Sequence, residues 1–445
     1  MSNSNAPAML ARPAAASAPP LASPEPTGRR HRRKDCSSLS MERITTLAAA
    51  EEILPAWRDL YDRGGSCNPY ASPDWLIPWA RHFVREDQLA LLAVYRSGTL
   101  IGMAPWYVRH VGPLLSQVYL LGSGGHDALT ELPQVLTAPG EARSVLRAAL
   151  QHWSQVPDTW DWLELPMLEE QGWFEPEWLA DAVGDRSFVQ HKLTRPSVVL
   201  ALPPDVATLY QTMKRNLRES IHRARNRLDR AGRPWAVTAH AEEDDIRKAL
   251  TVLAELHAAR ADLAGRRRHS DHLAAPKHRD FLADALGALA CRGQAEILTL
   301  DVEGVPVAAQ LVLRAPNSTY LGQSGVDPEW WNFSPVTLLQ LCAAESAVER
   351  GHKEFNLSTG PVVAKLRWSE QVVQNPEFIV CGPRRRSRAA FTAYRAASAV
   401  AAVERDAAFH RTKTRTRDMG MSRRLRRGGA PAGEARSRSA VSGGR

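Results

Sequence analysis

The sequence predicts a mixed α/β fold, and three features lead to this interpretation. Amphipathic segments with apolar residues at helical spacing, such as 73–84 and 210–230, alternate with short β-rich runs. Some of these runs are joined by tight-turn residues, as at Ser97-Gly98 and Glu303-Gly304, which is typical of antiparallel hairpins. Because helices and hairpins are interleaved, we expect mostly antiparallel, twisted sheets flanked by helices.

The length of 445 residues predicts more than one domain. We expect a disordered tail over 1–40, because its Ala, Pro and Ser residues bury little apolar surface. A first domain is expected over 41–200 and a second over 201–382. Residues 383–445 are rich in Arg, Ser, Gly and Ala and are expected to form a basic, partly helical or disordered tail.

The net charge of +9 belongs to the two ends of the chain. Residues 383–445 hold 17 Lys and Arg against 4 Asp and Glu, and residues 1–40 hold 6 against 2, so residues 41–382 carry a net charge of −8. An acidic middle does not attract nucleic acid, so we expect no stable nucleic-acid partner for the core. A peripheral contact of the basic C-terminal tail with an anionic surface stays open.

Cysteine usage and hydropathy exclude several classes of protein. The five cysteines are scattered and never form C-x-x-C, so neither a zinc site nor a disulfide framework is expected, and no metal is predicted. No apolar run reaches the ~18–20 residues of a membrane-spanning helix. The expectation is a cytoplasmic protein.

In the first predicted domain, helices are expected at Leu47–Tyr61, Pro73–Val84 and Glu141–Trp153, from the spacing of their apolar residues. Strands are expected at Leu89–Tyr95, Leu100–Arg109, Leu114–Leu121 and Trp160–Leu165. In the last of these, Asp161 and Glu164 are expected to point outward.

In the second predicted domain, Tyr210–Arg230 has the strongest helical pattern and a basic outer face, which fits either a solvated surface or an anionic ligand. Further helices are expected at Asp244–Ala261 and His278–Cys291, and strands at Glu296–Val302, Val305–Leu313 and Phe378–Val380. A strand that begins near Ala308 is expected to end at Thr319–Leu321.

The stretch from Thr319 to Trp368 is the most informative for function. After a turn at Gly325–Pro328, Ser334-Pro335 opens a helix that ends near Gly351, and Phe355–Leu357 reads as the next strand. The unpaired amides and positive dipole end of such a helix attract anions such as a diphosphate. Any β-turn-α-β unit has the same pattern, so a purely structural role stays open at this point.

Five blocks in this order resemble the acetyltransferase domain of the GNAT superfamily. The closer resemblance is to cellulose-biosynthesis-associated acetyltransferases, which are similar to the Fem-type aminoacyltransferases of peptidoglycan synthesis. The first predicted domain is similar to a second, degenerate GNAT-like unit, so the resemblance implies tandem GNAT-like domains. The blocks lie within residues 205–382 and are Met213–Leu228, Leu256–Arg260, Gly304–Arg314, Gly325–Leu339 and Glu349–Trp368.

This resemblance implies transfer of an acyl group from acetyl-CoA or another acyl-CoA to a small molecule or glycan precursor held between the domains. It implies that the coenzyme diphosphate binds at Ser334, Val336 and Thr337, and the acyl carbonyl near Gln323. The matched residues for catalysis are Lys365, which is cationic in the Fem-type relatives, the loop residue Asp127, and Asn356.

Three positions depart from the family pattern. Val336 stands where the family has Gly, Asn356 where it has Asp, and Ala364 where it has an aromatic residue. Two alternatives therefore stay open beside an active acyl-CoA transferase. One is a Fem-like enzyme that uses aminoacyl-tRNA, and the other is a catalytically degenerate scaffold. The sequence names neither the acceptor nor the acyl group.

Overall fold

The structure, a computed structural model, describes residues 39–64, 68–112, 115–124, 129–167, 176–183, 188–261 and 270–397. All of them belong to the contact unit Leu39–Arg445. Nearly all of the predicted tail 1–40, and the predicted tail beyond residue 397, lie outside the described residues.

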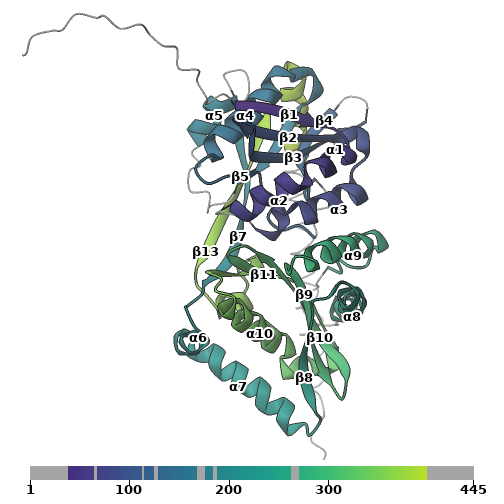
Figure 1. Ribbon diagram of the computed structural model, residues 1–445, viewed down its shortest axis with the longest axis vertical. Helices are drawn as coiled ribbons and strands as arrows, with labels where there is room; N and C mark the ends of the chain where they lie inside the picture. Colours follow the sequence, from purple (N-terminus) through teal and green to yellow (C-terminus); the bar gives the residue numbers. More distant parts are fainter. Residues whose placement is uncertain are drawn as a thin grey trace, which may run out of the picture. The chain divides into compact units, whose positions relative to one another are not determined.

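One mostly antiparallel sheet runs through this part of the chain, in the order β1-β2-β3-β4-β6-β13-β7-β12-β11-β10-β9-β8, with β5 beside β3 (Figure 1). Its parallel neighbours are β4 with β6 and β11 with β12. The sheet and its flanking helices confirm the predicted mixed α/β class. The strands are β1 Leu39–Ile44, β2 Leu89–Arg96, β3 Thr99–Val111, β4 Leu115–Leu120, β5 Leu136–Thr137, β6 Trp162–Pro166, β7 Phe188–Ala201, β8 Trp235–His240, β9 Ala295–Val302, β10 Val305–Ala315, β11 Ser318–Val326, β12 Glu354–Thr359 and β13 Val372–Cys381.

Helices cover both faces of the C-terminal half of the sheet. Leu311 and Leu313 of β10 join the hydrophobic core of α8 and α9, whereas Val312 joins the core of α7 and α10. This alternation follows the two-residue period of a strand. Figure 1 shows α8 and α9 on one side of these strands and α7 and α10 on the other. The helices are α1 Leu47–Glu52, α2 Leu54–Arg63, α3 Pro73–Phe83, α4 Ala142–Gln155, α5 Pro176–Val183, α6 Val206–Thr212, α7 Arg215–Arg230, α8 Glu243–Ala261, α9 Pro276–Ala290, α10 Pro335–Glu349 and α11 Val363–Leu366.

The predictions of single helices at 47–61 and 210–230 were wrong, because each stretch forms two helices. Pro55 lies in the first turn of α2, where its missing N–H is tolerated, and it prevents α1 from continuing. Lys214 separates α6 from α7 with an extended backbone (ψ 137°). Its amine donates to the Leu366 carbonyl at 2.9 Å and the Glu370 carboxylate at 2.7 Å, so a tertiary contact accompanies the break.

The prediction of one strand from near Ala308 to Leu321 was also wrong, because the chain turns at Pro316-Asn317 and forms the β10–β11 hairpin. Asp161 and Glu164 do not point outward: their exposed fractions are 1% and 4%. A helix at 385–397 packs Phe391 against Trp162 of β6, and its Ser387 hydroxyl donates to Asp161 at 2.6 Å. Glu164 instead accepts from the Lys192 amine of β7 at 2.6 Å.

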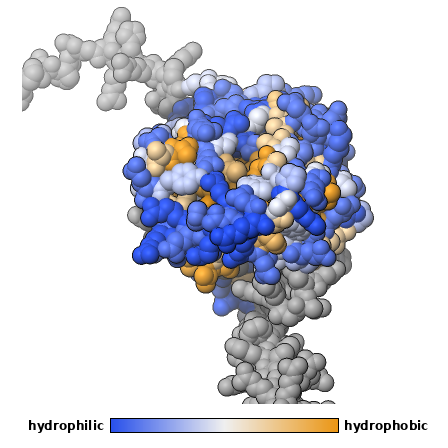
Figure 2. All heavy atoms as spheres, turned by 90° about the horizontal axis from the view of Figure 1, so that it is seen from below, coloured by the Kyte–Doolittle hydropathy of each residue, from blue (hydrophilic) through white to orange (hydrophobic). Residues whose placement is uncertain are grey.

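One face of the described residues is mostly hydrophilic. Figure 2 shows one face on which hydrophilic residues dominate and apolar patches are small. Among the described helices, none is long and apolar enough to cross a bilayer. Among the same residues, no three or more His, Cys, Asp or Glu side chains are arranged to hold a metal ion.

Gly325 of β11 gives a test of the packing between α8 and the sheet. A Cβ atom at Gly325 would lie 2.6 Å from the backbone of Leu256 and His257 in α8, so the backbone of α8 or of β11 would have to move. Gly325→Ala is expected to lower the free energy of unfolding by about 1–3 kcal/mol, measured by urea denaturation.

Gly287→Ala is the matched control. Gly287 lies within α9, and its added Cβ would meet first a flexible carboxylate oxygen of Glu243, at 3.3 Å. Helix propensity then predicts equal or slightly higher stability, by up to ~1 kcal/mol. Equal stability of the two variants would contradict the close packing of α8 on β11.

Candidate functional site

The parallel strands β11 and β12 are paired over only three residue pairs. The last of these joins Tyr320 to Asn356, and beyond it the two strands separate. On its other edge β12 pairs with β7, from Glu354 opposite Ala201 to Thr359 opposite Ser197. Because a strand edge that has lost its partner exposes backbone donors and acceptors, this is where an extended ligand can pair with the sheet.

A β-bulge lies in β11 just past the point of separation. The β10–β11 register shifts between Gln310 and Val312, and Gly322 and Gln323 fall outside the paired positions. The side-chain amide of Gln310 donates to the carbonyls of Gly322 at 3.0 Å and Gln323 at 3.3 Å. The Gln310 side chain therefore fixes both carbonyls. The backbone at Gly322-Gln323, where the acyl carbonyl was predicted to bind, does not take part in the regular β10–β11 pairing.

The N-terminus of α10 follows the short 3₁₀ helix η5, Pro328–Phe333. Ser334 adopts a left-handed conformation (φ 56°, ψ 44°), and its side chain caps no amide. The Ser334 amide donates to the Trp331 carbonyl, and the Thr337 amide to the Ser334 carbonyl, both at 3.1 Å. The backbone amides of Ser334, Val336 and Thr337 were predicted to bind the diphosphate. The Val336 amide is the one of these three without a backbone hydrogen bond, as expected for an amide in the first turn of a helix.

A cluster of polar and charged groups lies where β12 leaves β11. Glu131 reaches it from the N-terminal half of the chain and accepts hydrogen bonds from the Ser358 hydroxyl at 2.5 Å and the Thr359 amide at 3.1 Å. Lys365 of α11 donates from its amine to the Thr359 carbonyl at 2.6 Å. Residues distant in sequence thus converge on the end of β12.

The backbone of Ser358 is strained, since its φ of 75° lies in the left-handed region that favours glycine. Such strain costs of order 1–3 kcal/mol and persists only where neighbouring contacts fix it. Two contacts do so here: the Ser358 amide donates to Asn356 Oδ1 at 2.8 Å, and the Ser358 hydroxyl donates to Glu131. The hydroxyl is held in one direction as a result.

The two ionisable groups of the cluster have shifted pKa values. Burial raises the pKa of the Glu131 carboxyl, although its hydrogen bond from Ser358 and the nearby charge of Lys365 oppose this shift. Burial lowers the pKa of the Lys365 amine, and the charge of Glu131 opposes this shift. A carboxylate and an amine that titrate closer to neutrality are the usual requirement for acid–base chemistry.

A row of charged side chains leads away from this cluster across β7, β13 and β6. Glu377, which is 1% exposed, lies 3.6 Å from the Arg195 guanidinium and accepts from the Lys192 amine at 3.2 Å. Lys192 also donates to Glu164 at 2.6 Å. Arg195 acts electrostatically on Glu131 as well, so positive and negative groups alternate toward the cluster.

The structure brings some of the predicted site residues together. Lys365 lies in the cluster, Gln323 lies at the bulge, and Ser334, Val336 and Thr337 begin α10. Asn356 is 2% exposed and orients Ser358 through its side chain, which is a structural contact. Asp127 lies outside the described residues.

Glu131 and Ser358 were not predicted from the sequence. Glu131 lies only four positions after Asp127, so it was a second acidic candidate in the same part of the sequence. Its contact with Ser358 spans 227 residues of chain, so no local pattern reports it. The buried phenol Tyr70 beside this region was also missed; burial first, then the charge of Glu131, raises its pKa.

Comparison with known proteins identifies the type of domain and similar folds. Residues 215–366 match the family model for the acetyltransferase (GNAT) domain. The crystal structure of FemX is similar with a TM-score of 0.55 and 13% identity, over 76% of this chain and 96% of that one.

A second similar structure is a conserved protein of unknown function from Bacteroides thetaiotaomicron VPI-5482, with a TM-score of 0.50 and 12% identity, over 77% of this chain and 99% of that one. No curated protein matches. At these identities the structural likeness shows the fold alone, and the family match shows a GNAT-fold acetyltransferase domain in the C-terminal half.

The raised pKa of Glu131 predicts a pH-dependent stability. A carboxyl whose pKa is higher in the folded state than in the unfolded state destabilises the fold when it is ionised. This loss of unfolding free energy is absent below the unfolded-state pKa of about 4.3 and complete above the folded-state pKa. In Glu131→Gln this cost is removed. Between pH 4 and 7, the unfolding free energy of Glu131→Gln is therefore expected to rise relative to the wild type, as measured by urea denaturation.

Glu370→Gln is the control with the opposite sign. The hydrogen bond from Lys214 lowers the pKa of this exposed carboxyl, so its stabilising effect appears as pH rises and is lost in the variant. A Glu131→Gln difference that stays constant with pH, or falls as it does in Glu370→Gln, would contradict the burial of an ionisable carboxyl at this site.

Proposed function

We propose that this chain is a GNAT-type acyltransferase that moves an acyl group from a coenzyme A thioester to an amine or hydroxyl of a small acceptor. One observation carries the proposal: two separating parallel strands, with a bulge on one and the Glu131–Ser358–Lys365 cluster on the other, lie next to a helix N-terminus. The match of residues 215–366 to the acetyltransferase (GNAT) domain supports it.

In this proposal the thioester arm extends between β11 and β12, and the diphosphate meets the start of α10. The helix dipole and the Val336 amide favour an anion there, and the hydroxyls of Ser334 and Thr337 are at hand as further donors. Val336 brings a branched side chain to this position, so the diphosphate has less space than a glycine would leave.

The acyl carbonyl would lie against the bulge at Gly322-Gln323, where a backbone amide stabilises the developing oxyanion. The acceptor nitrogen or oxygen attacks the thioester carbon, and its proton passes to the Glu131 carboxylate. The new C–N or C–O bond forms, the C–S bond breaks, and the proton returns from Glu131 to the leaving thiolate. Lys365 adds positive charge beside the reacting carbonyl.

The acceptor is proposed to be small and polar. The alternating charges of Lys192, Glu377 and Arg195 suit a ligand that carries its own charges or many hydroxyls. The resemblance to cellulose-biosynthesis-associated acetyltransferases supports a cell-envelope glycan precursor, met in the cytoplasm.

A second candidate is transfer from an aminoacyl-tRNA, as in Fem-type enzymes. The basic surface of α7 favours it, since Arg215, Arg218 and Arg230 are exposed on that helix. A third candidate is a scaffold that has lost activity, which Val336, Asn356 and Ala364 favour. The Asn356 side-chain oxygen accepts a hydrogen bond from the Ser358 amide, and an Asp carboxylate at this position can accept the same bond. The replacement of Asp by Asn356 therefore does not by itself indicate lost activity.

Isothermal titration with acetyl-CoA tests the donor. The full chain is expected to bind acetyl-CoA with a dissociation constant below a millimolar, and to bind tRNA no more tightly at physiological salt than other polyanions. The absence of heat and of a thermal shift at millimolar acetyl-CoA, together with specific tRNA binding, would replace the first candidate with the second.

Turnover tests the reaction centre. Release of free thiol from acetyl-CoA is measured against a panel of amines and polyols, and Lys365→Met is expected to lower kcat by roughly 100-fold or more, because a cation beside the oxyanion is lost. Lys353→Met is the matched control: Lys353 is exposed just before β12, outside the cluster, and its loss is expected to change kcat less than about twofold. Equal effects of the two substitutions would remove Lys365 from the reaction centre.

A further inference from the structure

The turn between β12 and α11 carries an exposed apolar tip, which Val362 and Val363 form. Val362 is 43% exposed, and Val363, at 77%, has the highest exposure of the large apolar side chains in the described part of the chain. Pro361 and Ala364 on either side are exposed as well. Single exposed apolar residues are normal on a protein surface, but a contiguous group marks a contact site. A side chain as exposed as Val363 projects from the surface and does not line a hollow.

The apolar tip is held in place by contacts of α11. The Leu366 amide donates to the Val362 carbonyl at 3.0 Å and closes the turn that begins this short helix. The Leu366 carbonyl accepts from the Lys214 amine at 2.9 Å. The Arg367 guanidinium donates to the Asn216 carbonyl at 3.3 Å. These contacts fix α11, and the tip with it, against the start of α7.

Positive charge gathers where α11 meets the start of α7. Glu219 pairs with Arg215 and Glu370 pairs with Lys214, so two carboxylates offset half of the charge of the basic residues there. The first turn of α7 holds no acidic residue, and the helix dipole adds positive charge at this end. The basic residues of this junction are Lys214, Arg215, Arg218 and Arg367.

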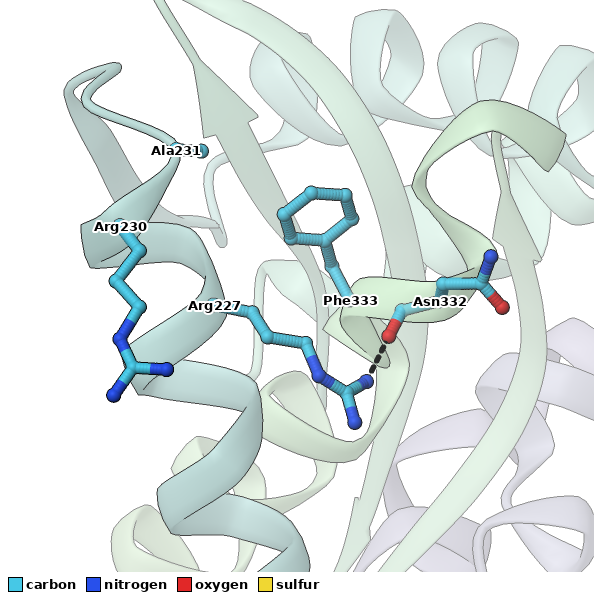
Figure 3. A pocket seen from close by; sticks show the side chains of 5 residues that line it. All are labelled: Arg227, Arg230, Ala231, Asn332 and Phe333. Atoms are coloured by element: carbon cyan, nitrogen blue, oxygen red, sulfur yellow. Dashed lines mark hydrogen bonds between the residues drawn. The ribbon is translucent and has the colours of Figure 1, made fainter.

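The helix that carries this charge is fixed at its other end too. There the Arg227 guanidinium donates to the Asn332 carbonyl of η5, as Figure 3 shows. Leu217 and Ile221 on the inner side of α7 are buried in the core of this half. The exposed Arg215 and Arg218 side chains therefore project from a rigid support, beside the apolar tip.

An apolar projection next to a basic surface has the chemistry that binds an anionic lipid bilayer. Apolar side chains enter the boundary between headgroups and acyl chains, while Lys and Arg side chains contact the lipid phosphates. A soluble polyanion such as RNA would contact the same cations but would leave Val362 and Val363 in water. The two valines therefore favour a bilayer over a nucleic acid as the partner.

We propose that Val362 and Val363 insert into the surface of an anionic lipid bilayer, with the basic residues at the start of α7 on the lipid phosphates. Ser358 and Lys365 lie on either side of the apolar tip in the chain, so this contact brings the end of β12 close to the bilayer surface. The inference goes beyond the acyltransferase function and does not depend on it.

Cosedimentation of the full chain with vesicles tests the inference. Vesicles of equal parts phosphatidylglycerol and phosphatidylcholine are expected to bind the wild type, and vesicles of phosphatidylcholine alone to bind it more weakly. Val362→Ser with Val363→Ser is expected to weaken binding to the anionic vesicles roughly tenfold or more, because two apolar side chains no longer enter the bilayer.

Val111→Ser with Val305→Ser is the matched control. These two valines are 40% and 63% exposed, but they lie at the end of β3 and the start of β10, away from α11. Their replacement is expected to change vesicle binding less than about twofold. Circular dichroism of each variant checks that the fold is retained.

A second pair of variants tests the basic residues. Arg215→Gln with Arg218→Gln is expected to weaken binding to the anionic vesicles roughly fivefold or more and to reduce its dependence on salt, because two contacts with lipid phosphates are lost. Arg247→Gln with Lys248→Gln removes the same charge from α8, on the opposite face of the sheet, and is expected to have a smaller effect. The basic C-terminal tail is the same in every variant and contributes equally to all of them.

Three results would overturn the inference. The first is a wild type that does not bind the anionic vesicles. The second is equal vesicle binding by the wild type and the Val362 and Val363 double variant, which would assign the binding to basic residues alone. The third is tight binding of RNA without binding of vesicles, which would make a soluble polyanion the partner of these cations. The proposed acyltransferase function stands in each case.

Discussion

The contact of Glu131 with the end of β12 is the interaction on which the candidate site depends. Its carboxylate holds the Ser358 hydroxyl and the Thr359 amide, and it fixes a backbone that would otherwise relax from φ 75°. Because β12 leaves β11 at this point, the same contact helps to keep the two strands apart. Burial raises the pKa of the Glu131 carboxyl, and the hydrogen bond from Ser358 and the charge of Lys365 oppose this rise.

This contact also connects the two halves of the sheet. Glu131 comes from the N-terminal half, whereas Ser358 and Lys365 come from the half that matches the acetyltransferase (GNAT) domain. The long β7–β13 ladder connects both halves, and its charged residues Lys192, Arg195 and Glu377 lead to the same place. The proposed function therefore assigns the N-terminal half a part in the chemistry as well as in support.

The fold class and most strands could be predicted from periodicity and turn residues, because these are local signals. The hairpin at Glu303-Gly304 was confirmed, since both residues take the positive φ that its turn requires. The break at Lys214 was missed because the apolar pattern continues across it. The break at Pro316-Asn317 had a local signal, since Pro and Asn are turn residues, and this signal was overlooked. Burial of Glu164 was missed because its partner Lys192 lies on another strand, and Glu131 was missed because its role is set by a residue 227 positions away.

The central claim is that a thioester lies between β11 and β12, beside Glu131 and Lys365. A crystal structure of the full chain with coenzyme A tests it most directly. The account predicts the coenzyme sulfur between the bulge at Gln323 and the hydroxyl of Ser358, with the diphosphate at the start of α10. A sulfur on another face of the sheet, or a coenzyme that does not enter between these strands, would contradict it.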